Sequence, residues 1–401
     1  MNYIKKILLV SFTIIFCFCG RKGTDKENSG NVLKIDLLSE SVSEVKNLSE
    51  LASDARYVPL QTTDSSLMSG FCRKVIKAGD KFYIHSGQEI LCFDSEGKFL
   101  YKLSNEGRGP QEYNFINDFD ISTDNRILSI LSHSTVMMFR ISGDGFDYQS
   151  KVNLKDPAPF RLGIVPESHN MFLAVAPWRG TEPSLSLLVD PGGDTISFKP
   201  NLYKYTTNRT SNYQAINEMV VYSAGKEVCF KEEFSDTVFS VDAKNNSFKP
   251  RIIFDSHGTL VTAEMRGGNE SYGTNTNYIA NVFETPRYVF YWYGTKEKHN
   301  RILFDKSTGT KNKLDMDNEA KSYVKDDLDG GPDFNVDFLN YYCSAGQLFS
   351  FVEAITLKKY IESDDFRNSK VSSVKKDELR KIADSLKETD NPVLVVVTPK
   401  D

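Results

Sequence analysis

The chain has 401 residues, and its 54 acidic and 49 basic residues give a formal net charge of -5. A mildly acidic chain argues against a nucleic-acid partner. The length exceeds the usual size of one compact core, so either two domains or a repeat fold is expected. With 27 Phe and 19 Tyr and few long helical patterns, the composition favours β-structure.

Residues 1–19 have the pattern of a secretion signal. Lys5 and Lys6 precede an apolar run from Ile7 to Cys19, which is shorter than the roughly 20 residues that span a bilayer. A cysteine at the polar boundary predicts lipidation, in which the signal is cut before a cysteine that is then acylated. We expect this residue to be Cys19, with Cys17 as the second choice and plain secretion or a retained anchor as alternatives. Residues 20–31 are expected to form a flexible tether.

From residue 32 onward, a short apolar and aromatic strand recurs at wide, fairly even spacing, which is typical of a repeat architecture. The first five copies lead into a second strand that ends in a turn rich in Asp, Gly, Ser or Asn, as a β-hairpin does. With one further strand before it, each copy makes a four-stranded antiparallel sheet of the size of a propeller blade. The six copies lie near Tyr83, Ser129, Leu173, Cys229, Phe290 and Phe349.

The sixth copy has an expected inner strand, FSFVE, and then departs from the pattern. Its missing outer strand can come from the other end of the chain, where ARYVPLQ, residues 55–61, stands alone. Pairing it with the terminal strand NPVLVVVTP closes a ring and removes open sheet edges. Residues 32–401 are therefore predicted to be an all-β, six-bladed β-propeller of four-stranded antiparallel blades, closed by pairing of the N- and C-terminal strands.

A helical insertion is predicted at about residues 372–389, because Leu379, Ile382, Ala383 and Leu386 fall on one helical face. We expect a surface helix packed on the last blade, with partner binding as the alternative.

The stretch NEGRGPQEY, residues 105–113, lies between an outer strand and the next inner strand, NDFDIS. A phosphate loop needs its glycines at a strand-to-helix junction, so this stretch is predicted to be a crossover between blades. Gly107 and Gly109 permit positive φ, and Glu112 can accept hydrogen bonds from loop amides. Arg108 is not required by a turn, and Arg108 and Glu112 are candidate ligand-binding residues.

The segments YVPLQ, FDSEGKFL, GRGPQEY, ETPRYVFYWY and DDLDGGPDF, together with the lipoprotein-like start, resemble the six-bladed β-propeller lipoproteins abundant in Bacteroidota, within the TolB-like propeller superfamily. The resemblance extends from about Val32 to the C-terminus. It implies the propeller fold and an extracytoplasmic, membrane-anchored location, and it indicates no activity. Phe18 stands before Cys19, where a typical lipobox has a small residue.

Three further segments are candidate sites. Asp329 and Asp333 belong to the acidic loop KDDLDGGPDFNVD, whose carboxylates could bind calcium or simply form turns. Arg266, Asn269 and Tyr272 lie in a polar, glycine-rich loop of the kind that rims carbohydrate sites. Trp178 and Arg179 follow an inner strand in APWRGTEPS and could reach the same face.

No GxSxG or HExxH hydrolase signature occurs, and the five histidines lie far apart. Cys72, Cys92, Cys229 and Cys343 form no CxxC pair and are expected to be buried thiols. The sequence therefore predicts a membrane-anchored binding or scaffold module for a glycan, peptide or partner protein, with no required cofactor. The alternative is a calcium-dependent hydrolase of the lactonase or esterase type found on other six-bladed propellers. Carboxylates from at least three blades converging at the central channel would favour the hydrolase.

Overall fold

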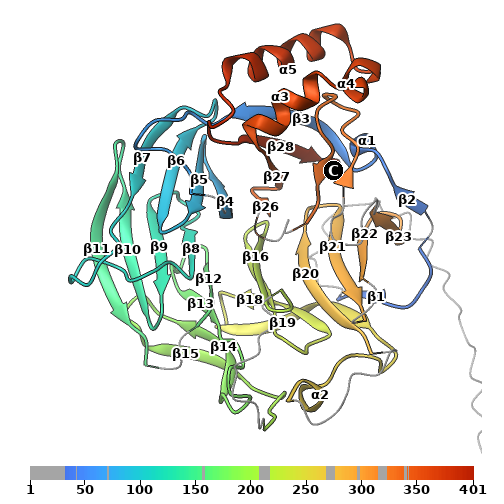
Figure 1. The fold of residues 1–401 in the computed structure, drawn as a ribbon. Helices are drawn as coiled ribbons and strands as arrows, with labels where there is room; N and C mark the ends of the chain where they lie inside the picture. The colour runs from blue at the N-terminus through green and yellow to red at the C-terminus, as the bar shows by residue number, and fades with distance from the viewer. Residues whose placement is uncertain are drawn as a thin grey trace, which may run out of the picture. The chain divides into compact units, whose positions relative to one another are not determined.

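The recurring strands form six sheets that are arranged in a ring in the computed structural model (Figure 1). The structure describes residues 32–41, 43–69, 72–155, 159–206, 217–267, 276–295, 299–314, 323–337, 341 and 343–401. Innermost strands of blades 1 to 5 contact one another in succession, and the innermost strand of blade 6 contacts that of blade 1. The predicted six-bladed β-propeller is confirmed.

The strands of each blade run in chain order from the innermost to the outermost position, except that β3 completes blade 6. Blade 1 consists of β4 (Cys72–Ala78), β5 (Lys81–Ser86), β6 (Glu89–Asp94) and β7 (Phe99–Leu103). Blade 2 consists of β8 (Asp118–Ile121), β9 (Ile127–Ser132), β10 (Thr135–Ile141) and β11 (Phe146–Asn153). Blade 3 consists of β12 (Arg161–Ile164), β13 (Met171–Ala174), β14 (Ser184–Val189) and β15 (Thr195–Pro200).

Blade 4 consists of β16 (Val220–Ala224), β17 (Glu227–Lys231), β18 (Thr237–Asp242) and β19 (Ser247–Asp255). Blade 5 consists of β20 (Tyr278–Glu284), β21 (Tyr288–Gly294), β22 (His299–Asp305) and β23 (Thr310–Leu314). Blade 6 consists of β26 (Cys343–Ser344), β27 (Gln347–Val352), β28 (Val393–Pro399) and β3 (Ala52–Pro59), and a separate two-stranded sheet pairs β24 (Tyr323–Val324) with β25 (Phe334–Asn335).

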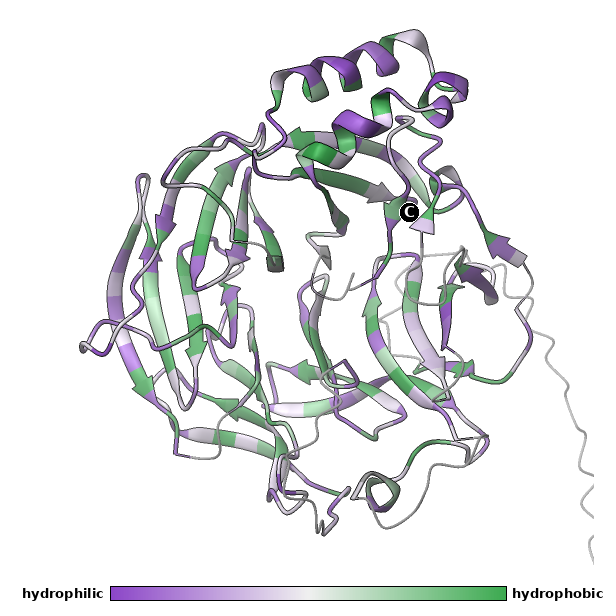
Figure 2. Cartoon of the chain, in the orientation of Figure 1, coloured by the Kyte–Doolittle hydropathy of each residue, from purple (hydrophilic) through white to green (hydrophobic). Residues whose placement is uncertain are grey.

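The recurring apolar strands are the second strands of the blades, so FSFVE, in β27, is not the innermost strand of blade 6. That position belongs to the two-residue strand β26. Middle strands such as β13 and β14 are buried along their whole length, because a neighbouring blade covers each face of the sheet and both faces need apolar residues. The outermost strand β11 alternates between exposed and partly buried residues along most of its length. Figure 2 shows the resulting concentration of hydrophobic residues on the blade strands.

The two ends of the chain close the ring in blade 6, as predicted. Strand β28 pairs antiparallel with β3, with Val393 opposite Pro59 and Val397 opposite Ala55, and it pairs with β27 on its other side. All five residues from Val393 to Val397 are buried. Two ends of the chain that are far apart in sequence thus form one sheet.

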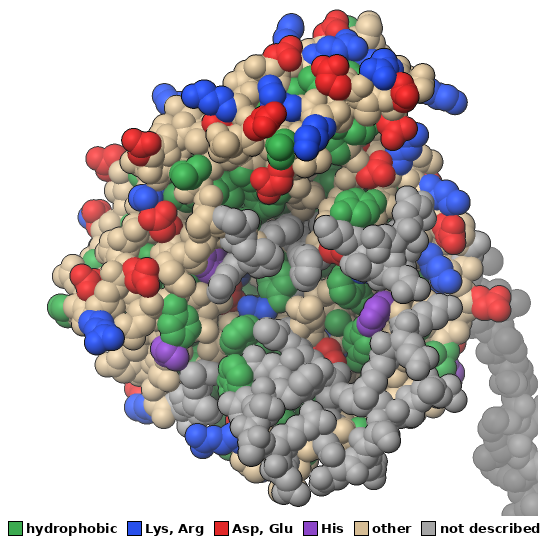
Figure 3. Space-filling model, viewed as in Figure 1, with side chains coloured by type: hydrophobic (Ala, Val, Ile, Leu, Met, Phe, Trp, Pro, Cys, Tyr) green, Lys and Arg blue, Asp and Glu red, His purple; other side chains and the backbone are tan. Residues whose placement is uncertain are grey.

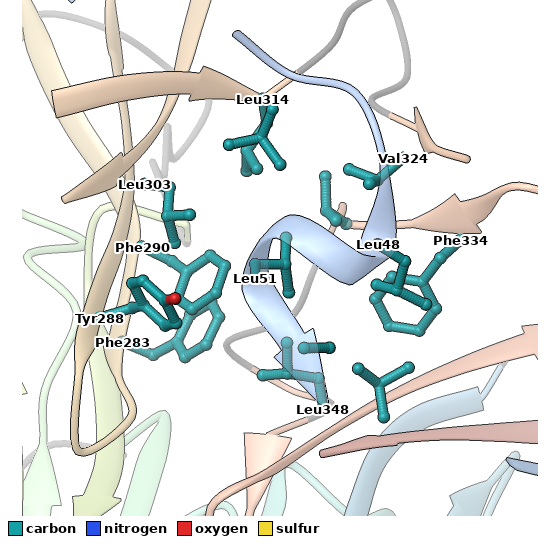
Figure 4. Close-up of a cluster of buried hydrophobic side chains, with 14 of the residues drawn as sticks. Leu48, Leu51, Phe283, Tyr288, Phe290, Leu303, Leu314, Val324, Phe334 and Leu348 are labelled. Atoms are coloured by element: carbon teal, nitrogen blue, oxygen red, sulfur yellow. The ribbon is translucent and has the colours of Figure 1, made fainter. Parts of the chain in front are cut away.

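The segment before β3 adds two strands that the sequence did not predict. Strand β1 (Leu33–Asp36) pairs in parallel with β19, and β2 (Ser43–Val45) pairs in parallel with β23, as fifth strands of blades 4 and 5. Helix α1 (Leu48–Leu51) follows, with Asn47 and Glu50 forming a capping box. Leu48 and Leu51 are fully buried, and Figure 4 shows them among side chains of blades 5 and 6 that include Phe290 and Leu348.

The predicted helix near the C-terminus is α5 (Ser373–Ser385), inserted between β27 and β28. Leu379 and Ala383 are buried, and Ile382 and Leu386 are partly buried against the same core, so the predicted apolar face is confirmed. Two shorter helices, α3 (Ala354–Ile361) and α4 (Asp364–Asn368), precede it and were not predicted. Ser363 and Ser372 cap α4 and α5 by accepting hydrogen bonds from backbone N–H groups. A fifth helix, α2 (Ala263–Gly267), follows blade 4.

Cys92 and Cys229 are buried thiols, as expected, and Cys72 is half-buried. Burial raises the pKa of the Cys92 thiol to about 11. The side chain of Cys343 lies outside the described residues. Within the part of the chain that the structure describes, no helix has the length and apolar character needed to cross a membrane.

Deleting residues 391–401 should abolish soluble expression rather than lower stability slightly. The deletion removes five buried aliphatic side chains, each worth about 1.5–3 kcal/mol, and this total is comparable to the whole stability of a domain, about 5–15 kcal/mol. A matched deletion of Lys400 and Asp401, which follow β28, should leave soluble expression intact. Soluble yield and thermal unfolding measure the effect. Native-like melting of the longer truncation would show that the ring closes elsewhere.

Candidate functional site

Antiparallel strand order places most of the predicted site residues on one face of the ring. Strand direction alternates within a blade, so the connections after the second and fourth strands emerge on the same side. We call this side the crossover face. Arg108 and Glu112 follow β7, Trp178 and Arg179 follow β13, and Asp329 follows β23. Asn269, Tyr272 and the side chain of Arg266 lie outside the described residues.

The crossover between blades 1 and 2 is a tightly hydrogen-bonded loop. The Gly107 N–H donates to the Tyr113 carbonyl at 2.9 Å, and the Tyr113 N–H donates to the Asn105 carbonyl at 3.0 Å. Tyr113 is buried, and its hydroxyl donates to the Gln88 carbonyl at 2.8 Å. These hydrogen bonds anchor the backbone of the loop to blade 1.

The two glycines of this loop are explained by close approach, not by positive φ. Neither Gly107 nor Gly109 has a positive φ, so that part of the prediction is wrong. The Glu112 carboxylate instead lies over the backbone, and its Oε2 accepts a hydrogen bond from the Gly109 N–H at 2.7 Å, as predicted. A Cβ added at Gly107 would lie 1.9 Å from that Oε2, so any larger residue must displace the carboxylate.

A pocket of about 670 Å³ lies between this loop and blade 2. The exposed Arg108 and Glu112 line it, so the structure brings these two predicted residues together. Blade 2 contributes the connection between β9 and β10 and the outer strand β11. We call this cavity the crossover pocket, and its polar lining residues are Glu106, Arg108, Glu112, Asn114, Ser132, His133, Thr135 and Lys151.

Sequence reasoning missed the blade 2 side of the pocket. His133 has a φ of 51°, its N–H donates to the Asn117 side chain at 2.8 Å, and its ring lies 4.1 Å from that of Phe115. Lys151 stands on β11, where its side chain is exposed. The only available signal was that His133 follows the second strand of a blade and so lies on the crossover face.

Trp178 and Arg179 do not join the crossover pocket. The half-buried Trp178 packs edge-on against Phe160 with 6.4 Å between ring centroids. Arg179 is exposed, and its backbone N–H donates to Glu182 Oε1 at 2.7 Å. Both residues lie on the crossover face, but they do not lie beside Arg108 in the crossover pocket. Their ligand-binding role stays a prediction.

The acidic loop after blade 5 uses its carboxylates to hold the fold together. Asp326 is 3% exposed and accepts hydrogen bonds from the Tyr57 hydroxyl at 2.8 Å and from three loop N–H groups. Asp329 forms an ion pair with Lys375 of α5. Burial raises the pKa of Asp329, and the Lys375 ammonium opposes that rise. Asp333 is exposed.

Carboxylates at the central channel bond to the neighbouring blade. Asp118 accepts from Lys74 Nζ at 2.9 Å and from the Leu162 N–H at 2.9 Å, and Asp120 accepts from the Ile164 N–H at 2.7 Å. Burial raises the pKa of Asp120. These bonds satisfy the open inner edge of β12. A cavity of about 170 Å³ remains between the innermost strands.

Across the described ranges, no three His, Cys, Asp or Glu residues are placed to hold a metal ion together. Both channel carboxylates come from blade 2, and their oxygens accept hydrogen bonds from N–H donors. The described residues therefore give the hydrolase alternative no observation in its favour.

The fold and site define a six-bladed propeller with a polar pocket on its crossover face. Residues 32–398 match the family described as a domain of unknown function, DUF4934. The chain belongs to this family.

One solved structure shares the fold, and a second is less similar. A protein of Bacteroides fragilis, described as a candidate exported protein, has 18% sequence identity and a TM-score of 0.63, covering 92% of this chain and 99% of that chain. A DUF4221 family member from Bacteroides vulgatus has 12% identity and a TM-score of 0.47, covering 87% of this chain and 97% of that chain. No curated protein matches the sequence. At 18% identity, the likeness to the Bacteroides fragilis protein shows the fold alone.

Replacing Gly107 by Ala should lower the free energy of unfolding by about 0.5–1.5 kcal/mol, the net worth of the hydrogen bond between Gly109 and Glu112 that the displaced carboxylate gives up. The same substitution at Gly143, where an added Cβ meets nothing within 4 Å, is the matched control and should change stability by about 0.5 kcal/mol or less. In a Glu112→Ala background, Gly107→Ala should cost much less. Equal costs in both backgrounds, measured by denaturant unfolding, would contradict the steric explanation.

Proposed function

We propose that the protein is a membrane-anchored, extracytoplasmic binding module that holds a polar ligand in the crossover pocket. The observation that carries this proposal is the pocket itself, about 670 Å³ with a largely polar and charged lining. Such a volume falls within the range of ligand sites, about 300–1,000 Å³. The anchor is acylated Cys19, as the pattern of residues 1–19 indicates, and the exported character of the similar Bacteroides fragilis protein supports the location.

The charges of the pocket favour a charged peptide segment of a partner protein over a neutral glycan. Arg108 and Lys151 supply cations and Glu106 supplies an anion, while Glu112 is engaged by the Gly109 N–H. Sugar binding commonly uses an exposed aromatic face. Tyr113 lines this pocket but is 1% exposed and cannot stack on a sugar, and the imidazole of His133 packs edge-on against Phe115.

Arg108→Ala should weaken ligand binding while leaving folding intact. An exposed side chain outside the core changes stability by about 0.5 kcal/mol or less, whereas a charge-assisted hydrogen bond to a ligand is worth about 1.5–3 kcal/mol, or roughly tenfold to a hundredfold in affinity. Peptide and glycan arrays on the full-length protein would find the ligand, and calorimetry would compare the variants.

The matched control for this experiment is Arg126→Ala. Arg126 is also exposed, but it lies in the connection between β8 and β9, on the opposite face of the ring. This variant should bind like the wild type. If Arg108→Ala instead unfolds the protein, Arg108 is a structural clamp, and if both variants bind normally the ligand lies outside the crossover pocket.

Cys19→Ala should move the protein from the membrane fraction to the soluble fraction, because acylation of that thiol is the proposed anchor. Fractionation followed by immunoblotting measures the distribution, and Cys17→Ala serves as the matched control, since Cys17 is removed with the signal. Unchanged membrane retention of the double variant would contradict the lipid anchor.

A further inference from the structure

One buried cation in the described residues has no anionic or carbonyl partner. The buried cations of those residues are Arg161, Lys231, Arg301 and Lys311. Arg301 forms an ion pair with Asp337 at 2.8 Å, and both lysines donate to backbone carbonyls. Arg161 is 9% exposed, and its hydrogen bond goes to a neutral hydroxyl, that of Tyr341. Buried charges are otherwise paired in proteins, so Arg161 is an exception that needs an explanation.

The contact between Arg161 and Tyr341 lies on the axis of the ring. Arg161 begins β12 of blade 3, and Tyr341 precedes β26 of blade 6. Blades 3 and 6 are opposite one another in a six-bladed ring, so their innermost residues can meet only at the centre. The Tyr341 carbonyl also accepts from the Val75 N–H of blade 1 at 3.1 Å. Its hydroxyl donates to the Asn217 side chain, just before blade 4, at 3.4 Å.

The guanidinium group is held in a fixed plane. Its central carbon lies 4.7 Å from the ring centroids of both Phe160 and Tyr341, so aromatic rings stabilise its charge. Stacking engages the two faces of the group, and the hydrogen bond to Tyr341 uses one of its five N–H donors. The other N–H groups make no hydrogen bond to the described residues.

The unbonded N–H groups of Arg161 are not completely enclosed by protein. Buried side-chain atoms without a hydrogen-bond partner in the described residues belong to Glu182, Asn281 and Tyr291, and none belongs to Arg161. The carboxylates that bond to the backbone of β12, Asp118 and Asp120, accept hydrogen bonds from Lys74 and from backbone N–H groups. The N–H groups of Arg161 that do not bond to Tyr341 are therefore available to a ligand.

We propose that Arg161, positioned by Phe160 and Tyr341, binds an oxyanion at the axis of the ring on the crossover face. A carboxylate is the favoured form, because two parallel N–H groups of a planar guanidinium match its two oxygens. The ligand is then a small molecule or chain end that carries a carboxylate, and a phosphate group offers the same oxyanion chemistry. This site is separate from the crossover pocket and does not depend on the ligand proposed there.

The experiment titrates the full-length protein with acetate and, separately, with inorganic phosphate, using chloride at matched ionic strength as the reference. Binding to the folded state raises the unfolding temperature as ligand concentration increases. We expect acetate or phosphate to raise it beyond the chloride reference, with the stronger of the two identifying the oxyanion. Arg161→Met, which keeps an unbranched side chain between the rings, should bind at least tenfold more weakly by calorimetry.

The matched control is Arg140→Met. Arg140 is an exposed arginine of β10 paired with Asp147, and its loss should leave the oxyanion response unchanged. A wild-type protein that responds equally to chloride, or an Arg161→Met variant that binds as tightly as the wild type, overturns the proposal. If Arg161→Met does not fold, Tyr341→Phe provides the test. This variant keeps the aromatic ring that stacks on the guanidinium and removes the hydroxyl that accepts its hydrogen bond. It should bind the oxyanion at least as tightly as the wild type, and weaker binding overturns the proposal.

Discussion

The pairing of β3 with β28 is the constraint on which the rest of the structure depends. It joins the two ends of the described chain in one sheet, with Val397 opposite Ala55 and Val393 opposite Pro59. A closed ring leaves each blade with a neighbour on both faces, which is why the middle strands carry continuous apolar runs. Closure also fixes the distance across the axis, and only in a closed ring can Arg161 of blade 3 reach Tyr341 of blade 6.

The inner edges of the blades face a narrow channel, and their backbone groups need partners. Side chains at equivalent positions in successive blades act as these partners. Lys74 of blade 1 donates a hydrogen bond to Asp118 of blade 2, and Asp118 accepts one from the Leu162 N–H of blade 3, so that each step spans 44 residues. The regular spacing follows from the equal length of the first two repeats. Carboxylates in the channel thus have a structural explanation, and acidic residues near the axis of a propeller are not by themselves evidence of a metal site.

The sequence allowed the blades and their closure to be predicted, because repeated strands and the isolated ARYVPLQ segment are strong local signals. Strands β1 and β2 escaped prediction, since LKID and SEV are short and pair in parallel with strands more than 200 residues away. The prediction that Gly107 adopts a positive φ was wrong, because a glycine in a sequence does not reveal its backbone conformation. The close approach of the Glu112 carboxylate to Gly107 arises only in the folded loop. Arg161 could not have been selected, since its partner Tyr341 is 180 residues distant and the contact exists only after all six blades close.

The arginines of the two proposed sites differ from the charged side chains at the rim of the ring. In Figure 3, charged side chains gather at the rim while hydrophobic ones lie nearer the centre. Rim pairs such as Arg140 with Asp147 and Lys155 with Asp194 are exposed, so solvent screens them and they contribute little to stability. A guanidinium fixed by two rings on the axis loses little conformational entropy when it binds. Arg108, on an exposed loop, must be ordered by its ligand. The axial site therefore favours small, planar anions, and the crossover pocket favours larger ligands whose many contacts offset the cost of ordering its side chains.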